Sequence, residues 1–384
     1  MAPRDRVVVV GAGVAAHGAV TGLRQAGFEG EVVLVGREPH PPYERPFLSK
    51  RYLLHEVPRA QLFLPSVAAD LRLGEEVVEL EPDRHAVHTA GGERLEYGAL
   101  VLATGARPRL LPGHEDGVYL RELDQADRVR DALDRGEPLD VVGAGFIGCE
   151  VAAVARQRGL PVTVHEALDQ PLLRVLGPEL GAWLGGVHRD RGVDLRTGVR
   201  ELPPLRPGTL IGVGTQPNVE LAAGAGIRCE GGVVVDELGR TDAPDVYAAG
   251  DCARFLSPLF ETHVRVEHYQ TAHRHGSATG RAVAGEGAPF AEAPWFWSDQ
   301  YDLNLQYAGA GLAWDRTVVR GEVGRPPFTA FFLHGDRLVG ALGVDDGRTV
   351  GHVRRLLEAR AEVTPDQLAD RAVDLKRLSR PAPR

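Results

Sequence analysis

Cysteine is scarce in this sequence, and its scarcity excludes several kinds of site. The three cysteines, Cys149, Cys229 and Cys252, lie far apart along the chain. They cannot form the Cys-x-x-Cys pairs of zinc knuckles and dithiol redox centres, nor the dense pattern of a disulfide scaffold. This usage fits a reducing compartment, so we expect a cytoplasmic protein.

The sequence also lacks excess positive charge and long apolar runs. The formal net charge is -9 and the isoelectric point is about 5.9, with no basic stripe of the kind that binds nucleic acid. No uninterrupted apolar stretch approaches the ~18 residues of a membrane span. Residues 4–20 superficially resemble a signal peptide, but Gly11, Gly13 and Gly18 interrupt the apolar run. We therefore expect a soluble protein with no nucleic-acid or membrane partner.

A group of four histidines does not amount to a metal site. His263, His268, His273 and His275 are close in sequence, but no carboxylate or cysteine completes a ligand set. His273 and His275 would also point to different sides of a helix. We expect no bound metal.

Glycine, in contrast, is abundant. The 384 residues include 47 glycines, with 43% hydrophobic and 25% charged residues, which is typical of a globular protein with many tight turns. At ~100 to 200 residues per domain, the length predicts two or three packed units. We expect three.

Two segments share the order strand, glycine-rich turn, helix, strand. In the first, a strand at 7–10 leads into Gly11-Ala12-Gly13-Val14-Ala15-Ala16, a helix to about residue 26 and a strand at 31–35. In the second, a strand at 139–142 leads into Gly143-Ala144-Gly145-Phe146-Ile147-Gly148, a helix to about residue 158 and a strand at 161–165. Such turns let backbone N–H groups approach a diphosphate at a helix start, and Ala16 is an accepted substitute for the third glycine. Two turns predict two bound dinucleotides.

The stretch between the two copies predicts a small antiparallel insert. Alternating residues at 76–80, 86–89 and 94–97 read as strands, with Gly91-Gly92 as a hairpin turn. A strand at 99–103 and its later counterpart at 210–214 both end in glycines. In the later copy only the proline-rich segment 198–209 stands where an insert would be, which predicts a shortened domain.

The last part of the chain has a different character. From Trp295 aromatic residues cluster, and strands are expected at 317–320, 328–334 and 338–344. A helix at about 349–361 carries Val353, Leu356 and Leu357 on one face. This predicts an α+β unit, and the tail after Leu378 is expected to be free.

Acidic residues after the strands indicate which nucleotides bind. Glu166 follows the strand at 161–165, where a carboxylate can accept both ribose hydroxyls and repel a 2′-phosphate, so NADH is preferred over NADPH. Arg158 and Arg174 leave NADPH open, and Glu166 could also be a solvated strand-end residue. In the first copy the corresponding residue is Glu38, beside Arg37. Asp251, after Gly250, is expected to accept hydrogen bonds from the ribityl hydroxyls of a flavin on the first turn.

Five segments resemble the signatures of FAD-dependent, NADH-dependent ferredoxin reductases of the putidaredoxin reductase and biphenyl dioxygenase reductase type. They are Pro42-Tyr43-Glu44-Arg45-Pro46-Phe47-Leu48-Ser49-Lys50, residues 143–150, Gly250-Asp251, Arg265-Val266-Glu267-His268-Tyr269 and Trp297-Ser298-Asp299-Gln300-Tyr301. The resemblance covers nearly the whole chain, and Arg-Pro-x-Leu-Ser-Lys and Trp-Ser-Asp-Gln are its most specific parts.

The resemblance implies a glutathione-reductase-like α/β fold with two Rossmann-type domains and a C-terminal α+β domain. Residues 1–114 and 236–293 would form the FAD-binding domain, 115–235 a shortened NADH-binding domain, and 294–384 an interface domain that covers the flavin. The segment 36–52 contains no cysteine, whereas related disulfide and peroxide reductases carry a nucleophilic cysteine there.

Site residues are also carried over by the resemblance. Arg45 and Lys50 would lie close to the isoalloxazine, and Glu150 would pair with Lys50, so Lys50 and Glu150 are the expected catalytic residues. A cation beside the flavin lowers the cost of negative charge as hydride arrives. The helix from about 267 to 284 would direct its positive end toward the flavin, with Tyr269 where the family usually has Trp. Trp297 would shield the flavin face, although it alternates with Trp295 as strand residues do, and one of the two could be a core residue.

Each cofactor has a full set of expected binding residues. For FAD they are Gly11, Gly13, Ala15, Ala16, Glu38, Arg45, Lys50, Val78, Ala103, Thr104, Gly105, Gly250, Asp251, Glu267, His268, Tyr269 and Trp297. For NADH they are Gly143, Gly145, Phe146, Ile147, Gly148, Glu166, Gly212, Val213 and Gly214.

Without a cysteine relay, electrons are expected to leave the flavin directly for a [2Fe-2S] ferredoxin that feeds a cytochrome monooxygenase or a Rieske-type oxygenase. The expected docking cations for an acidic ferredoxin are Arg316, Arg320, Arg354, Arg355 and Arg360, with a solvated helix face as the alternative. Two other functions stay open: a redox-signalling flavoprotein similar to apoptosis-inducing factor, and a stand-alone flavin oxidase. We expect a monomer or a homodimer.

Overall fold

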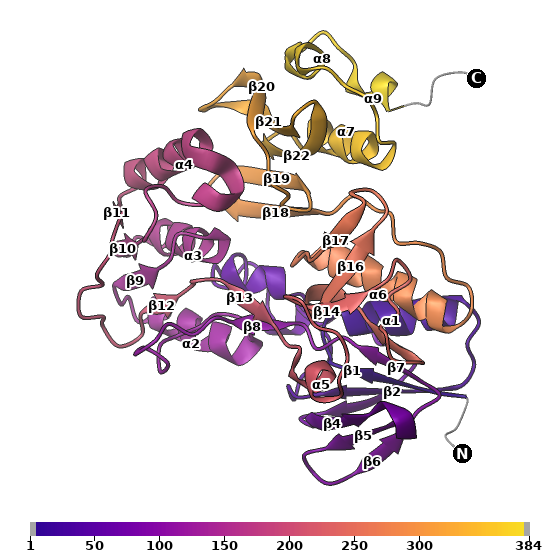
Figure 1. Ribbon diagram of the computed structural model, residues 1–384. Helices are drawn as coiled ribbons and strands as arrows, with labels where there is room; N and C mark the ends of the chain where they lie inside the picture. Colours follow the sequence, from indigo (N-terminus) through magenta and orange to yellow (C-terminus); the bar gives the residue numbers. More distant parts are fainter. Residues whose placement is uncertain (1–4, 380–384) are drawn as a thin grey trace. The chain divides into compact units, whose positions relative to one another are not determined.

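The structure, a computed structural model (Figure 1), describes residues 5–379. Its contacts group the chain into two compact units. Unit 1 contains the residues up to Glu44, Phe63–Arg107 and Gln216–Pro294. Unit 2 contains Arg45–Leu62, Pro108–Thr215 and the residues from Trp295 onward. Each unit is therefore assembled from three separate pieces of sequence.

A five-stranded parallel sheet forms the centre of unit 1, in the order β15-β7-β1-β2-β3. Its strands are β1 (Arg6–Val10), β2 (Glu31–Gly36), β3 (Asp70–Leu73), β7 (Ala99–Leu102) and β15 (Val246–Ala248). Val7, Val8 and Val9 are all buried, because β1 is a central parallel strand with both faces covered. The strands expected at 7–10 and 31–35 are confirmed.

Helices α1 (Val14–Gln25) and α6 (Tyr269–Val283) pack closely in unit 1, and Figure 1 shows them side by side. Glycines make this contact possible. A Cβ on Gly18 would lie 2.2 Å from the carbonyl oxygen of His273, and one on Gly276 would lie 2.1 Å from that of Ala15. The helices therefore approach backbone to backbone beside the first glycine-rich turn.

Two smaller sheets and a short helix complete unit 1. The antiparallel insert is confirmed, with β4 (Val77–Glu81), β5 (Ala86–Thr89) and β6 (Arg94–Glu96) in this order. Gly92 adopts a φ of 85° in the predicted hairpin turn. The other elements are α5 (Glu220–Gly224), η3 (Pro82–Arg84), η4 (Gly250–Cys252), β14 (Val233–Val235), β16 (Ala253–Ser257) and β17 (Thr262–Val264).

Unit 2 contains the second parallel sheet, in the order β11-β10-β9-β12. The strands are β9 (Leu139–Val142), β10 (Val162–His165), β11 (Val193–Arg196) and β12 (Leu210–Ile211). The helices are α2 (Leu123–Asp134), α3 (Phe146–Gln157) and α4 (Leu173–Asp190), with η1 (Arg45–Ser49) and η2 (Arg59–Gln61) on the first piece of the unit. The strand, turn, helix, strand order of the second copy is thus confirmed.

The strand expected at 210–214 is wrong at its end. It stops at Ile211, and β8 (Ala106–Pro108) and β13 (Thr215–Pro217) lie at two of the five places where the chain passes from one unit to the other. Gly214 has a φ of 106°, a conformation that turns the chain out of an extended path. Residues 197–209 form no strand, so no insert matches β4–β6 in this copy.

An antiparallel sheet forms the C-terminal part of unit 2, in the order β18-β19-β22-β21-β20. Its strands are β18 (Trp295–Gln300), β19 (Leu303–Gly309), β20 (Arg316–Glu322), β21 (Arg325–His334) and β22 (Arg337–Val344). The leucines of α4, including Leu176, Leu180 and Leu184, share a core cluster with Phe328 and Phe332 of this sheet. The antiparallel C-terminal sheet and the parallel sheet β11-β10-β9-β12 are therefore parts of one packed unit.

Three helices follow the C-terminal sheet: α7 (Gly347–Glu358), α8 (Pro365–Ala369) and α9 (Leu375–Leu378). Val353, Leu356 and Leu357 are buried on α7, as its pattern predicted. The short helices α8 and α9 were not anticipated, and the free tail predicted after Leu378 lies, from residue 380, outside the described residues. No helix within residues 5–379 has the length and apolar character needed to cross a membrane.

Arg320, an expected docking cation, has a different role. Its guanidinium donates to the carbonyl oxygens of Leu368 (2.7 Å), Gln367 (3.0 Å) and Asp370 (2.8 Å). Burial lowers its pKa. The side chain holds the α8 segment against β20, so we withdraw it from the docking set.

Replacing Arg320 should loosen the α8 segment, which its guanidinium holds against β20. We expect Arg320→Ala to lower the free energy of unfolding by about 2 kcal/mol, because several carbonyl groups lose a charged donor. Chemical denaturation measures the loss, and limited proteolysis should map new cleavage sites near α8. Arg316→Ala, on the exposed start of the same strand, is the matched control; equal stability of the two variants would contradict the clamp.

Candidate functional site

The first glycine-rich turn has the geometry of a diphosphate cradle. A Cβ on Gly11 would lie 2.2 Å from the carbonyl oxygen of Ala103, so only glycine fits between β1 and β7. A Cβ on Gly13 would meet nothing within 4 Å. Helix α1 starts directly after Gly13 with no side-chain cap and no acidic residue in its first turn. Its first N–H groups are therefore available to an anion beside Gly13.

The second turn repeats this arrangement in unit 2. A Cβ on Gly143 would lie 2.4 Å from the carbonyl oxygen of Gly212, and one on Gly148 would lie 2.0 Å from that of Gly143. Gly145 has only the oxygen of Gly212 at 4.0 Å. Helix α3 also begins without a side-chain cap or an acidic residue in its first turn. Both turns thus fit a dinucleotide diphosphate.

The two acidic residues after the second strands differ in their contacts. Glu166 is buried, and its carboxylate accepts hydrogen bonds from the backbone N–H groups of Ala144 (2.6 Å) and Leu168 (2.8 Å). It is therefore held against the glycine-rich turn, with further lone pairs left for ribose hydroxyls. Glu38 accepts a hydrogen bond from Tyr43 at 2.5 Å. Both residues stay expected ribose ligands.

The strand ends that were expected to face the flavin converge in unit 1. Thr104 donates from Oγ1 to the carbonyl oxygen of Asn218 (2.7 Å), and the Asn218 side chain donates back to that of Thr104 (2.7 Å). Asn218, which the sequence reading missed, therefore holds the segment Ala103–Gly105 in place. Gly250 has a φ of 76°, and a Cβ there would lie 2.5 Å from that of Ala15, so Asp251 follows a turn packed onto α1.

The segment 267–269 does not start a helix at its first residue. His268 is the N-cap of α6, whose first helical residue is Tyr269, and Glu267 precedes the helix. Burial, and then the charge of Glu44, raise the pKa of Tyr269 to about 12. Val78 lies in a bulge of β4 with a 57% exposed side chain. Its role in binding FAD stays a prediction.

Lys50 and Glu150 form a buried ion pair in unit 2. The Lys50 Nζ lies 2.8 Å from Glu150 Oε2, with side chains only 8% and 3% exposed. Lys50 also donates to the carbonyl oxygen of Pro46 at 3.1 Å. Ser49 donates to Oε2 of Glu150, and Ser298 donates to Oε1 at 2.6 Å. The pair implied by the family resemblance is present, and three donors surround its carboxylate.

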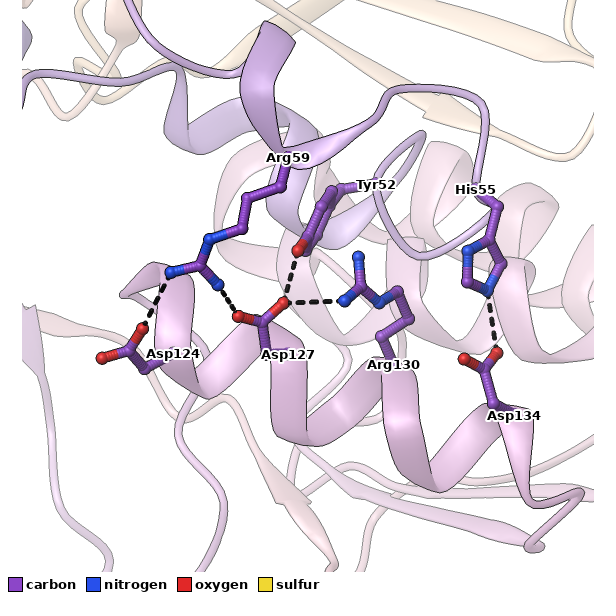
Figure 2. Close-up of polar contacts among 7 residues, drawn as sticks. All are labelled: Tyr52, His55, Arg59, Asp124, Asp127, Arg130 and Asp134. Atoms are coloured by element: carbon purple, nitrogen blue, oxygen red, sulfur yellow. Dashed lines mark hydrogen bonds and ion pairs between the residues drawn. The ribbon is translucent and has the colours of Figure 1, made fainter. Parts of the chain in front are cut away.

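A second group of polar contacts fixes the segment that carries Lys50 (Figure 2). Asp127 of α2 accepts from Tyr52 and Arg59 of this segment and from Arg130 of its own helix. The Arg130 guanidinium lies 4.3 Å from the centre of the Tyr52 ring. We call these four residues the Asp127 latch.

About two turns of α2 beyond Asp127, a separate contact joins the same two segments. His55 lies 2.8 Å from Asp134, and both are drawn in Figure 2. Arg158 binds Asp134 at 2.5 Å and the carbonyl oxygen of Leu53 at 3.0 Å. The hydrogen bond from His55, followed by that from Arg158, lowers the pKa of Asp134. The Lys50 segment is thus attached to α2 at two points.

Three of the expected FAD residues belong to unit 2 and the others to unit 1. The three are Arg45, Lys50 and Trp297. Arg45 donates to the carbonyl oxygen of Arg121 at 2.8 Å. The Trp297 ring centre lies 5.9 Å from that of Trp295, so both tryptophans of β18 belong to one aromatic pair.

None of the three cysteines has the setting of a redox nucleophile. All are free thiols, and Cys149 and Cys252 are buried. Burial raises the pKa of both, which keeps them protonated and unreactive. Together with two uncapped glycine-rich turns, this set of sites defines a pyridine-nucleotide-dependent oxidoreductase without a thiol relay.

Comparison with known proteins identifies the family. Residues 5–201 and 207–276 match the pyridine nucleotide-disulphide oxidoreductases, and residues 295–379 match the reductase C-terminal domain. The chain belongs to the pyridine nucleotide-disulphide oxidoreductase family and, within it, to the FAD-dependent ferredoxin–NAD(+) reductases. The resemblance stated from the sequence motifs and the glutathione-reductase-like fold are confirmed.

Three relatives illustrate the similarity. Rhodocoxin reductase from Rhodococcus erythropolis is 37% identical, over 96% of this chain and 93% of its own. The anthranilate 1,2-dioxygenase system ferredoxin–NAD(+) reductase component from Burkholderia cepacia is 39% identical, over 97% and 98%. The crystal structure of the covalent putidaredoxin reductase–putidaredoxin complex superposes with a TM-score of 0.91 at 34% identity, covering 97% of both chains.

Sequence reasoning missed several residues around the Lys50–Glu150 pair. Ser49, Ser298 and Gln300 lie inside the signature segments of the family, but the sequence alone indicates no role for them. His188 lies in α4 and contacts Gln300. Nothing in its sequence surroundings marks it, because a lone histidine on an apolar helix face is an ordinary core residue.

Gly13 and Gly145 both have room for an added Cβ, so alanine substitutions there can test the two cofactor sites separately. We expect Gly13→Ala to fold normally, because its Cβ meets no atom within 4 Å, yet to lose FAD, because the Cβ takes the space of the diphosphate. Gly145→Ala should keep FAD and raise the NADH dissociation constant. Each affinity should fall about tenfold or more, a loss of ~1.4 kcal/mol.

Flavin absorbance after purification and NADH titration measure the two effects. Gly186→Ala, in α4 with nothing within 4 Å of its Cβ, is the control and should keep both ligands. A Gly13→Ala protein that retains its full flavin content would refute the cradle.

Proposed function

We propose that this protein is an NADH-dependent ferredoxin reductase that binds FAD. The observation that carries the proposal is the presence of two uncapped glycine-rich turns, one in each unit, in a chain with no cysteine at 36–52. Two cradles fit an electron donor and a resident flavin. Because segment 36–52 has no cysteine that could relay electrons, they must pass from the flavin directly to an external acceptor. A [2Fe-2S] ferredoxin serving a cytochrome monooxygenase or a Rieske-type oxygenase is that acceptor, by analogy with the relatives.

Bound FAD would accept hydride from NADH and release electrons one at a time. The protein's own residues prepare this exchange. The turn at Gly11–Ala16 and the start of α1 hold one diphosphate, and Asp251 accepts from the ribityl hydroxyls. Lys50 supplies a fixed positive charge for the flavin, and Glu150 holds that charge in place. Arg45, Tyr269 and Trp297 contribute to the same site, as the family resemblance implies.

NADH is the preferred nucleotide. Glu166 presents a carboxylate at the second turn, held by two backbone N–H groups. A 2′-phosphate would place like charges against this carboxylate, which costs several kcal/mol. Arg158, an open alternative for NADPH, is bonded to Asp134 and Leu53. Phe146, Ile147, Gly212, Val213 and Gly214 complete the NADH set.

The acceptor surface is expected on the C-terminal part. Arg316, Arg355 and Arg360 are exposed there, and the Arg354 guanidinium lies 5.3 Å from the ring centre of Trp295. An acidic ferredoxin would be attracted by these cations.

We further propose three domains. Residues 1–114 with 236–293 form the FAD domain, 115–235 the NADH domain, and 294–384 the interface domain. A cytoplasmic location and a monomeric or homodimeric state complete the proposal, the former supported by the three free cysteines.

Anaerobic rapid mixing tests the function. The flavin absorbance should be lost at least about tenfold faster with NADH than with NADPH at equal limiting concentrations, because of Glu166. Subsequent mixing with a [2Fe-2S] ferredoxin should restore the flavin absorbance. Slow reduction with a long-lived charge-transfer band would favour a signalling role similar to apoptosis-inducing factor. Rapid NADH consumption in air with no added carrier would favour an oxidase.

Lys50 provides a residue-level test. Lys50→Met should retain FAD but slow its reduction by NADH by about 100- to 1,000-fold, as expected when one preorganised donor is removed. The chain has only one other lysine, Lys376 on α9, so Lys376→Met is a matched control that should behave as wild type. An unaltered reduction rate in Lys50→Met would overturn the assigned role.

A further inference from the structure

A continuous line of hydrogen bonds leads away from the Lys50–Glu150 pair into unit 2. Ser298 Oγ lies 2.6 Å from Glu150 Oε1, and Gln300 Nε2 lies 3.1 Å from Ser298 Oγ. Next, Gln300 Oε1 lies 2.9 Å from His188 Nε2, and His188 Nδ1 lies 2.9 Å from the Tyr301 hydroxyl. We call these five residues, from Glu150 to Tyr301, the Glu150 network.

The donors and acceptors of this network can be arranged in one direction only. Glu150 faces the ammonium of Lys50 and is an acceptor, so Ser298 must donate its hydroxyl proton to Oε1. The Ser298 oxygen then accepts from the amide nitrogen of Gln300, which leaves the Gln300 oxygen facing His188. His188 must therefore carry its proton on Nε2, and its bare Nδ1 accepts from Tyr301. The charge of Glu150 thus determines the tautomer of a histidine three hydrogen bonds away.

Burial makes this arrangement strict. Ser298, Gln300 and His188 are exposed by 1%, 0% and 2%. Water cannot replace a missing partner there, and an unsatisfied polar group costs about 1 to 3 kcal/mol. Burial also lowers the pKa of His188 to about 4, so its ring is neutral near pH 7. Glu150 is therefore the one charged member of the network.

The network also joins separate pieces of sequence. Glu150 stands on α3, His188 on α4, and Ser298 and Gln300 on β18. Ser49 and Lys50 belong to the segment held by the Asp127 latch. Gln300 has no ionisable proton, so the line cannot carry protons through its amide. Its effect is mechanical and electrostatic.

We propose that Ser298, Gln300 and His188 are positioning residues that hold the Glu150 carboxylate, and through it the Lys50 ammonium, in one orientation for the flavin reaction. The kinetic part of this proposal rests on the proposed function, whereas the arrangement of protons in the network does not. The two parts therefore have separate experiments.

The first experiment measures the tautomer of His188 by ¹⁵N NMR of the purified holoprotein, labelled at histidine, at pH 7. The His188 signal is identified by its loss in His188→Gln. In wild type it should show the Nε2-H tautomer. In Glu150→Gln the new amide can keep its oxygen toward Lys50 and donate to Ser298, which reverses every following hydrogen bond. His188 should then change to the Nδ1-H tautomer.

A matched control separates this effect from a general disturbance. Glu166→Gln replaces another buried glutamate of unit 2 that has no bond to the network, and the His188 signal should stay that of wild type. An unchanged His188 tautomer in a folded Glu150→Gln protein would overturn the proposed proton order. If Glu150→Gln fails to fold, a wild-type His188 in the Nδ1-H tautomer would overturn it equally.

The second experiment measures the consequence for catalysis. Ser298→Ala removes one donor to Glu150 with almost no change in volume. Flavin reduction by NADH should slow about tenfold, with the FAD content and the NADH dissociation constant unchanged. With only two lysines in the chain, ¹⁵Nζ labelling should also show the Lys50 ammonium signal broadened by faster exchange in this variant. Ser257→Ala, a buried serine of unit 1 outside the network, is the control.

Each result has a definite meaning. A Ser298→Ala protein with wild-type reduction kinetics and a wild-type Lys50 signal would refute the positioning role. A slower variant that has also lost FAD would make the serine merely structural and would refute it too. If wild type itself is not reduced by NADH, the proposed function fails while the His188 measurement still decides the proton order.

Discussion

The buried pair of Lys50 and Glu150 is the interaction on which the arrangement of unit 2 depends. Each charge loses its hydration when its side chain is 8% or 3% exposed, and the effective cost is several kcal/mol per ion unless the partners and further hydrogen bonds are in place. Lys50 meets this condition with the carboxylate and the carbonyl oxygen of Pro46. Glu150 meets it with two serine hydroxyls. Three pieces of the chain must therefore come together around one carboxylate.

The Asp127 latch and the packing of α4 support the same convergence. Asp127 collects three donors from two segments (Figure 2), so the Lys50 segment is tied to α2 although it precedes that helix by many residues. On the other side, leucines of α4 share a core with the C-terminal sheet, which brings His188 toward Gln300. Polar contacts orient the charged pair, and apolar burial supplies most of the driving force that assembles the elements around it.

Much of the fold could be predicted because its signals are local. A glycine between two backbones, a hairpin at Gly92 and an apolar stripe on α7 each depend on a few neighbouring residues. The helix α4 was not anticipated, since Gly177, with a φ of 78°, and Pro178 interrupt its pattern by a kink. Arg320 was misassigned because a cation on a strand carries no sign of the carbonyl groups that fold back upon it.

The sequence by itself determined the chemistry available to this protein: two glycine turns, an acidic residue after each copy's second strand, and no thiol beside the first. These features act over short stretches, so the order of residues is enough to reveal them. Only the tertiary structure decided that Ser298, Gln300 and His188 surround Glu150, and in which direction their protons point. Hydrogen-bond partners are selected by distance in space, and here burial removes the water that could otherwise take their place.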